Sequence, residues 1–562
     1  MLFRFGVSGL VLAIGSMLMV ACGTPHAARH PASPPSESGD VVQFEPGLDS
    51  AAEQRARALA HFGTGVVHDT DEDPEASLEE YYQAALLDPS YEPLTLQVAD
   101  GLVHRKQLDK ALELLTRAAA RPGASGSIYS RLGMVYAQLG KTEQAIAADR
   151  TAIKRSPDRL GGYQNLFLTY LQNHQAAEAL KVLDSAAQQT DVDAEFLIGL
   201  SELYGSYIQQ APTQKDKLKP KVVAILARAD KLDPQNPLLR LRLADGFNLF
   251  GESGRAAQLY LDLLKRLPDI PFLRERLHSK LAGIYMRGSE RKQAAEQLQA
   301  IVRDDPTNPM AWYYLGFLSY DDKKPADAAE YFGKTVLLSP DFEDAYYELS
   351  LAQISLNQVP DALATLEKAR KKFKDNFVLE FYSGLAYSRQ KNYAEALRCF
   401  TAAEVIARAG DPKHLDQDLY FQLGACSERT GDYTQAENYF EKCLELAPDN
   451  AEAQNYLGYM WAEHGLKLDK ARTLIEKALK AEPKNPAYLD SMGWVLFKLN
   501  QPQAALEQVR HAVELSTEPD PTLYDHLGDI YSALQQRDKA REAWTKSLSL
   551  EPNETVRKKL DH

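Results

Sequence analysis

The chain has 562 residues, of which 44% are hydrophobic, 25% charged and 9% aromatic, with four cysteines. This composition is that of an ordinary globular protein and excludes a collagen-like, low-complexity or disulfide-rich chain. The 64 Lys and Arg residues against 78 Asp and Glu residues give a net charge of −14, which argues against a nucleic-acid partner because phosphate contacts need a basic surface. The length fits either several separate cores or one solenoid with a continuous core.

Residues 1–22 have the pattern of a bacterial signal peptide. Arg4 supplies a positive charge, and the apolar run after it is shorter than the roughly 20 residues that a membrane-spanning helix needs. Met19-Val20-Ala21-Cys22 resembles a lipobox, whose cysteine is lipidated and becomes the mature N-terminus, although Met19 stands where that motif prefers Leu, Val or Ile. A general secretory signal is the alternative.

If the lipobox interpretation is correct, palmitate-type chains attached to Cys22 anchor the protein in a membrane. Gly23 follows the cysteine in place of Asp. By resemblance to Gram-negative lipoproteins, this implies sorting to the outer membrane, facing the periplasm.

Residues 23–46 are rich in Pro, Ser, Ala and Gly, which predicts a disordered tether with a reach of about 25–30 Å. His26 and His30 have a metal-like spacing, but neither a helix nor a third ligand holds them. We predict no metal site and no cofactor.

From residue 47 to residue 554 the sequence repeats itself with a period of 34 residues, as Ala111, Ala145 and Ala179 illustrate. A Leu-Gly pair precedes many of these alanines, a bulky residue follows them, and a proline closes many units. Apolar positions recur three and four residues apart, which predicts helices. Turns such as Leu139-Gly140-Lys141 divide each unit into two helices.

These residues resemble the tetratricopeptide repeat (TPR), a two-helix hairpin that stacks into a superhelix. The resemblance covers most of the chain and implies an all-α, right-handed superhelical solenoid of about fourteen repeats, the first of them degenerate. We expect residues 555–562 to form a C-terminal cap. Extra residues around Gln209–Lys219 predict a loop between helices, and smaller insertions fall near 271–274 and 411–416.

No active-site motif stands out, because HExxH, GxSxG and a strand-linked GxGxxG are missing. Gly140-Lys141-Thr142 lies at a turn between helices and does not form a phosphate-binding loop. We therefore predict that the chain is not an enzyme. The cysteines after Cys22 are expected to be core residues, and whether one disulfide joins two of them stays open; they are Cys399, Cys426 and Cys443.

TPR proteins bind partners on a concave face, and the resemblance implies that the second, fifth, ninth, twelfth and thirteenth positions of each first helix line it. In repeats 309–410 these positions are apolar; nearer the C-terminus they are aromatic and acidic, as at Asp490, Asp525 and Asp529. Exposed aromatic side chains favour protein or peptide docking, although each is equally able to pack against the next repeat. The candidate partner-binding residues are Tyr313, Phe317, Tyr320, Tyr347, Leu351, Phe381, Tyr459, Trp494 and Phe497.

The last repeats, including the runs 486–494 and 524–531, resemble those of large TPR lipoproteins of Gram-negative bacteria. One such type is an adaptor that holds a carboxy-terminal processing protease at the outer membrane and brings it cell-wall hydrolases. The resemblance implies a non-catalytic scaffold with protein partners in the periplasm. Two alternatives are a structural lipoprotein of an envelope secretion or pilus machine, and an enzyme with an unrecognised site in the first 100 residues.

Overall fold

The computed structural model describes residues 50–267 and 270–560, and within these ranges all regular secondary structure is helical. The all-α fold expected from the sequence is therefore confirmed. The predicted signal peptide, its Cys22 and the tether 23–46 lie outside the described residues. None of the helices in the described ranges is long and apolar enough to cross a membrane.

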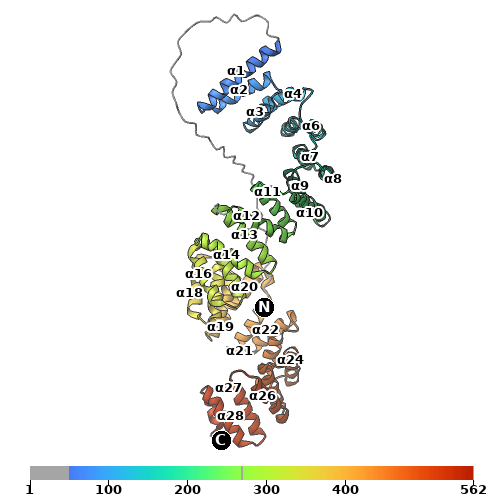
Figure 1. Cartoon of the computed structure of the whole chain (residues 1–562). Coiled ribbons are helices and arrows are strands. Elements are labelled where there is room, and N and C mark those ends of the chain that lie inside the picture. Colours follow the sequence, from blue (N-terminus) through green and yellow to red (C-terminus); the bar gives the residue numbers. More distant parts are fainter. Residues whose placement is uncertain (1–49, 268–269, 561–562) are drawn as a thin grey trace. The chain divides into compact units, whose positions relative to one another are not determined.

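The chain divides into two compact units. The first ends within the seventh helix and comprises residues up to 157 together with 161–169. In both units, helices that are neighbours in the chain lie side by side as hairpins (Figure 1). The helices of the first unit are α1 (Ser50–Thr70), α2 (Pro74–Leu87), α3 (Glu92–His104), α4 (Leu108–Ala119), α5 (Gly126–Gln138), α6 (Thr142–Arg155) and most of α7 (Leu160–Gln172).

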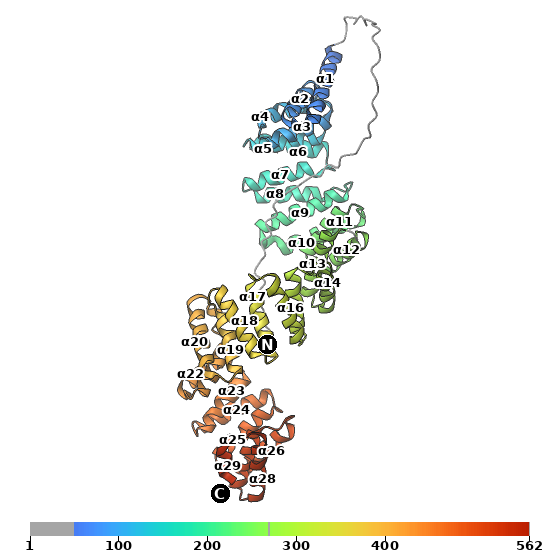
Figure 2. The ribbon, with the colours of Figure 1, turned by 90° about the vertical axis from the view of Figure 1, so that its left-hand side faces the viewer.

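The second unit comprises residues 158–160 and 170–562 and continues the hairpin pattern to the last described helix (Figure 2). Its helices are α8 (Ala176–Ala187), α9 (Ala194–Gln210), α10 (Lys215–Lys231), α11 (Pro237–Leu249), α12 (Ser253–Arg266), α13 (Pro271–Arg287), α14 (Arg291–Asp304), α15 (Pro309–Asp321), α16 (Pro325–Leu338), α17 (Glu343–Ser355), α18 (Val359–Lys372), α19 (Phe377–Arg389), α20 (Tyr393–Gly410), α21 (Gln417–Arg429), α22 (Tyr433–Leu446), α23 (Ala451–Glu463), α24 (Leu468–Ala481), α25 (Pro486–Lys498), α26 (Pro502–Leu515), α27 (Pro521–Ala533), α28 (Arg537–Leu550) and α29 (Glu554–Leu560).

Small residues let the two helices of a hairpin approach closely. In the α15–α16 hairpin, a Cβ added to Gly316 would lie 2.7 Å from ring carbons of Phe332, and Ala328 has no exposed surface. The α19–α20 hairpin repeats this packing, because a Cβ on Gly384 would lie 2.6 Å from the ring of Phe400. The recurring Gly, Ala and bulky residues of the sequence thus form one interlocking contact within each of these hairpins.

The prediction of a loop around Gln209–Lys219 is wrong. Helix α9 continues to Gln210, a short 3₁₀ turn covers Pro212–Gln214, and α10 starts at Lys215. The extra residues lengthen both helices because some of them find core contacts: Leu218 is only 3% exposed. The insertions near 271–274 and 411–416 are also partly helical, since α13 starts at Pro271 and a 3₁₀ turn spans Pro412–His414.

At the C-terminal end, α29 begins one residue before the segment 555–562 that was expected to cap the last hairpin. Its Val556 is 1% exposed and packs against Ala540 and Trp544 of α28. The segment therefore covers apolar surface of the final hairpin, as a capping element does.

Candidate protein-docking surface

The candidate residues fall on two groups of first helices in the second unit. Helices α15, α17 and α19 carry the set from Tyr313 to Phe381, and α23 and α25 carry Tyr459, Trp494 and Phe497. Their exposure differs widely, so each group is described by what its side chains contact.

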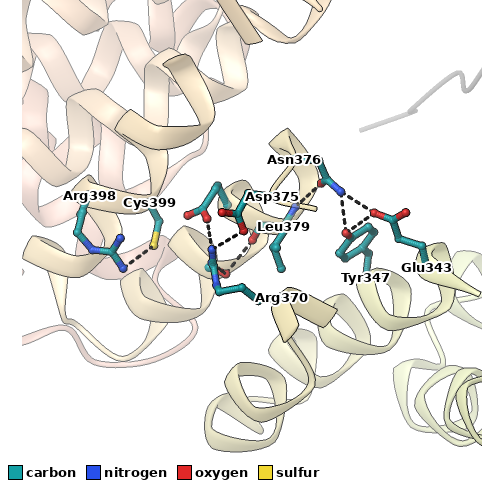
Figure 3. Close-up of polar contacts among 10 residues, drawn as sticks. Glu343, Tyr347, Arg370, Asp375, Asn376, Leu379, Arg398 and Cys399 are labelled. Carbon is teal, nitrogen blue, oxygen red and sulfur yellow. Dashed lines mark hydrogen bonds and ion pairs between the residues drawn. The ribbon is translucent and has the colours of Figure 1, made fainter. Parts of the chain in front are cut away.

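Tyr347 of α17 is 4% exposed and belongs to a hydrogen-bond network between repeats. Its hydroxyl donates to Glu343 at 2.7 Å and accepts from Nδ2 of Asn376 at 2.7 Å. Asn376 caps α19 by accepting from the backbone N–H of Leu379, and also donates to Glu343 at 2.6 Å (Figure 3). Tyr347 therefore joins α17 to the start of α19 and offers no free contact area.

The next junction is fixed by Arg370 of α18. Its guanidinium pairs with Asp375 at 3.0 Å (Figure 3). It also pairs with the buried Glu380 of α19. Close by, Phe381 is half-buried and stacks on Phe377 with ring centroids 5.4 Å apart. These contacts hold α19 in place and cover much of the surface of the Phe381 ring.

The surface of α15 remains open. Phe317 is 42% exposed, Met310 44% and Tyr314 37%. Tyr313 lies half-buried beside them, its ring 4.7 Å from that of Phe342, and the Tyr320 hydroxyl lies 3.0 Å from that of Ser355 on α17. Large apolar side chains on one helix face, rimmed by polar groups, are typical of protein-contact surfaces.

Two carboxylates of α17 adjoin this aromatic surface. Burial raises the pKa of Glu348 to about 7, and the negative charges of Asp344 and Asp321 add to the effect. Burial also raises the pKa of Asp344, with a contribution from Glu343. Within the described part of the chain, the side chains of Asp344 and Glu348 have neither a hydrogen-bond donor nor a basic partner.

Tyrosines from the flanking helices lie within electrostatic reach of Glu348. The pKa of Tyr382 on α19 is raised by burial and then by the charge of Glu348, and the same two causes raise the pKa of Tyr313 on α15. We call this set the tyrosine–carboxylate surface; it comprises Tyr313, Tyr320, Asp344, Glu348 and Tyr382, with Met310, Tyr314 and Phe317 at its rim. The stripe expected to be apolar thus contains Asp344, at the second position of α17, and Glu348 lies one turn further along the same helix.

Sequence reasoning missed Glu348, Tyr382 and Tyr314 because they occupy the sixth position of their helices. That position lies one turn from the second and so faces the same side. Helical periodicity was the signal that would have included them. Leu351, by contrast, was expected and lies half-exposed on α17.

The C-terminal candidates have partners of their own. Trp494 is 6% exposed, and its indole N–H donates to Glu463 at 2.6 Å. One face of the ring stacks on His526 with centroids 3.9 Å apart, and Phe497 stacks on it at 5.2 Å. Tyr459 is half-buried beside His526, at 6.2 Å. Trp494 therefore stabilises the contact between repeats and presents little surface.

The acidic side chains of this region are paired as well. His526 lies 3.0 Å from both carboxylate oxygens of Asp490. The ammonium of Lys559 on α29 donates to Asp525 at 2.8 Å and to Asp529 at 2.7 Å. The tyrosine–carboxylate surface, whose carboxylates have no such partners in the described residues, is therefore the better candidate for docking.

Other chemistry finds little support in the described residues. No three His, Cys, Asp or Glu side chains come together there as a metal site would require. The cysteines left open by the sequence are free and buried; they are Cys399, Cys426 and Cys443.

The stacked hairpins define a helical-repeat protein. Models of the tetratricopeptide repeat match residues 99–159, 280–345, 319–378, 378–449, 428–486 and 521–554. These ranges together span more than half of the chain, which therefore belongs to the tetratricopeptide-repeat family. A repeat solenoid of this kind is suited to protein–protein interaction.

Similar proteins include the TPR repeat-containing protein PA4667 of Pseudomonas aeruginosa, 29% identical over 219 residues, which are 39% of this chain and 36% of that protein. Cellulose synthase operon protein C of Pseudomonas fluorescens is 23% identical over 541 residues, covering 85% of this chain and 42% of that protein. The chain thus spans less than half the length of these relatives. The crystal structure of the APC/C hetero-tetramer Cut9–Hcn1 aligns with a TM-score of 0.39 at 15% identity, over 82% of this chain and 94% of that one.

Proposed function

We propose that the chain is a non-catalytic scaffold that binds protein or peptide partners through the tyrosine–carboxylate surface. The observation that carries the proposal is the exposure of Met310, Tyr314 and Phe317 on one face of α15. Apolar side chains of this size gain by leaving water, and aromatic rings do so with little loss of side-chain entropy.

The cellular setting of the proposal is an outer-membrane lipoprotein that faces the periplasm. The lipobox-like sequence before Cys22 and the residue after it support this setting. The resemblance of the last repeats to those of TPR lipoproteins supports the more specific role of an adaptor that brings a protease to its substrates, such as cell-wall hydrolases. A part in the assembly of an envelope secretion or pilus machine is the second candidate and rests on the same resemblance.

The docking role is tested by photo-crosslinking in living cells. A benzophenone amino acid at Tyr314 probes the surface, and the same residue at Leu337 of α16 is the control, because Leu337 is 78% exposed and lies on a second helix. We expect one identified protein to be captured from position 314 and not from 337. The adduct should disappear when Met310 and Phe317 are both changed to Ser.

The identity of the captured protein separates the roles. A protease or a cell-wall hydrolase supports the adaptor, whereas a secretin or pilus subunit supports the assembly role. Equal capture from both positions, or capture that survives the double Ser substitution, contradicts docking at this surface.

The lipid anchor is tested separately, by palmitate labelling and membrane fractionation of the wild type and of Cys22→Ser. We expect label and outer-membrane sedimentation in the wild type only. An unlabelled wild type would remove the anchor from the proposal and leave the docking role intact.

A further inference from the structure

We propose that Asp344 and Glu348 bind a lysine or arginine side chain of the partner, carried on a peptide segment with apolar residues beside it. This inference rests on the proposed docking function and names the chemistry of the partner. Its basis is a comparison of two carboxylate pairs in the same chain, one with a bound cation and one without.

The occupied pair is Asp525 and Asp529 of α27. Four residues separate them, so their side chains lie one turn apart on one helix face. Lys559 bridges them at 2.8 Å and 2.7 Å, and the indole N–H of Trp544 adds a donor to Asp529 at 3.0 Å. An ammonium group placed between two carboxylates in this way neutralises both and satisfies their oxygens.

The empty pair is Asp344 and Glu348 of α17, which have the same four-residue spacing. Glu348 is half-buried and Asp344 is exposed, and the described residues supply no cation or donor to either side chain. Asp321 of α15, whose charge also acts on Glu348, is already paired with Arg291 at 3.1 Å. Two like charges one helical turn apart, of which that of Glu348 is partly desolvated, repel each other and gain from a cation that comes between them.

The aromatic side chains around the pair complete the complementarity. Tyr313 of α15 and Tyr382 of α19 lie within electrostatic reach of Glu348, and a cation gains further from the face of an aromatic ring. Phe317 and Met310 stay exposed on the same helix as Tyr313. A basic side chain flanked by apolar ones therefore matches both the charge and the apolar surface.

The test is a selection of twelve-residue peptides from a displayed random library on the full chain. Asp344→Asn with Glu348→Gln removes both charges. The matched control is Asp327→Asn with Glu330→Gln, which removes two charges from exposed positions of α16. Circular dichroism of each variant establishes that it is folded, and fluorescence polarisation gives the peptide affinities.

We expect the selected peptides to contain Lys or Arg next to apolar residues. Their affinity should fall about tenfold or more in the Asp344/Glu348 variant and stay unchanged in the control. Replacement of the basic residue of a selected peptide by Gln should weaken binding to the wild type by a similar factor, and should have little effect in the Asp344/Glu348 variant.

Two results overturn the inference and are distinguishable. Selected peptides that lack basic residues, or that bind the Asp344/Glu348 variant as tightly as the wild type, contradict the basic partner while docking still stands. Failure to select any peptide that competes with crosslinking from position 314 removes the docking function, and the inference with it.

Discussion

His526 and Asp490 form a buried pair between two repeats, with Nδ1 of His526 3.0 Å from both carboxylate oxygens. His526 is 4% exposed and Asp490 7%. Burial disfavours the charged imidazole, but the charge of Asp490 and its hydrogen bond together outweigh burial, so the pKa of His526 is raised. The pair is consequently ionic over a wider pH range than a free histidine allows.

The first prediction concerns the pH dependence of this pair. Because the folded pKa of His526 lies above its unfolded value of about 6.5, the pair stabilises fully below that value, and the stabilisation is lost as pH rises through the folded pKa. Asp490→Ala should cost about 3–5 kcal/mol near pH 6 and less at high pH. Amide exchange in α25 and α27, expressed as protection factors, measures the effect.

Asp538→Asn is the control for this prediction, since Asp538 is an exposed residue of α28. Its protection factors should match those of the wild type at each pH. A loss of protection in Asp490→Ala that is the same at pH 6 and pH 9 would mean that the ionic form does not stabilise the junction.

The sequence was sufficient to predict the helical hairpins because their determinants are local. Pro309 and Pro486 open α15 and α25, where a missing N–H costs nothing. The left-handed backbone conformation of some turns could also be predicted, because glycine marks it: Gly140 and Gly431 have φ of 70° and 88°. Other turns place Lys323 or Lys391 in this conformation, and no local pattern marks them.

The docking residues were harder to predict because exposure depends on partners in the next repeat. Tyr347 is held in a buried position by its hydrogen bond with Asn376. Trp494 is held likewise by its hydrogen bond to Glu463 and by stacking on His526. Nothing in the sequence near Tyr347 distinguishes it from Tyr313, which occupies the same position of its helix. The same holds for the acidic residues, because the sequence alone does not show that Asp525 has a basic partner and that Asp344 has none among the described residues. The pairing of Asp525 becomes evident only from the position of Lys559 in the structure.

The second prediction contrasts two glycines of one hairpin. Gly316→Ala should destabilise the protein by about 1–3 kcal/mol, because the new Cβ would meet the Phe332 ring at 2.7 Å. Gly333→Ala should stabilise it by about 0.5–1 kcal/mol, since no atom of the described residues lies within 4 Å of its added Cβ. Thermal unfolding and amide exchange in α15 and α16 report both changes, and two shifts of the same sign would contradict the packing.

The third prediction concerns thiol chemistry. Cys399, Cys426 and Cys443 are at most 1% exposed, and burial raises the pKa of their thiols to about 11, 11 and 12 respectively. Since the thiolate is the reactive form, N-ethylmaleimide at pH 7.5 should leave all three unmodified in the folded protein. In denaturant without reductant, all three should react, as mass spectrometry of their peptides would show.

Leu337→Cys supplies the positive control for labelling, because position 337 is 78% exposed in the wild type. It should react fully under conditions that spare the buried thiols. Disulfide-linked peptides containing two of the three cysteines would show instead that the thiols are not free in the cell.

The last prediction concerns Asp149 of the first unit, which stands where other hairpins carry an aromatic ring. It has no exposed surface, and its Oδ1 would lie 2.1 Å from a Cβ on Gly133. Asn165 donates to Oδ1 at 3.4 Å, while Oδ2 has no hydrogen-bond partner among the residues that the structure describes. Burial raises the pKa of Asp149 to about 8, against a smaller opposing effect of Asn165, so the carboxyl is held largely neutral at pH 7.

Because the pKa of Asp149 is higher in the folded state than its unfolded value of about 3.9, the folded state holds the proton more tightly. The protein therefore loses stability as the pH rises from the unfolded pKa through the folded one. Asp149→Asn keeps the shape of the neutral acid and cannot ionise. Protection of α5 and α6 amides should therefore be similar in the two proteins at pH 5 and higher in the variant at pH 9. Glu143→Gln, an exposed change on the same helix, should behave as the wild type. If protection in the wild type did not fall between pH 5 and pH 9, Asp149 would have to be ionised in the core, with a counter-charge to hold it there.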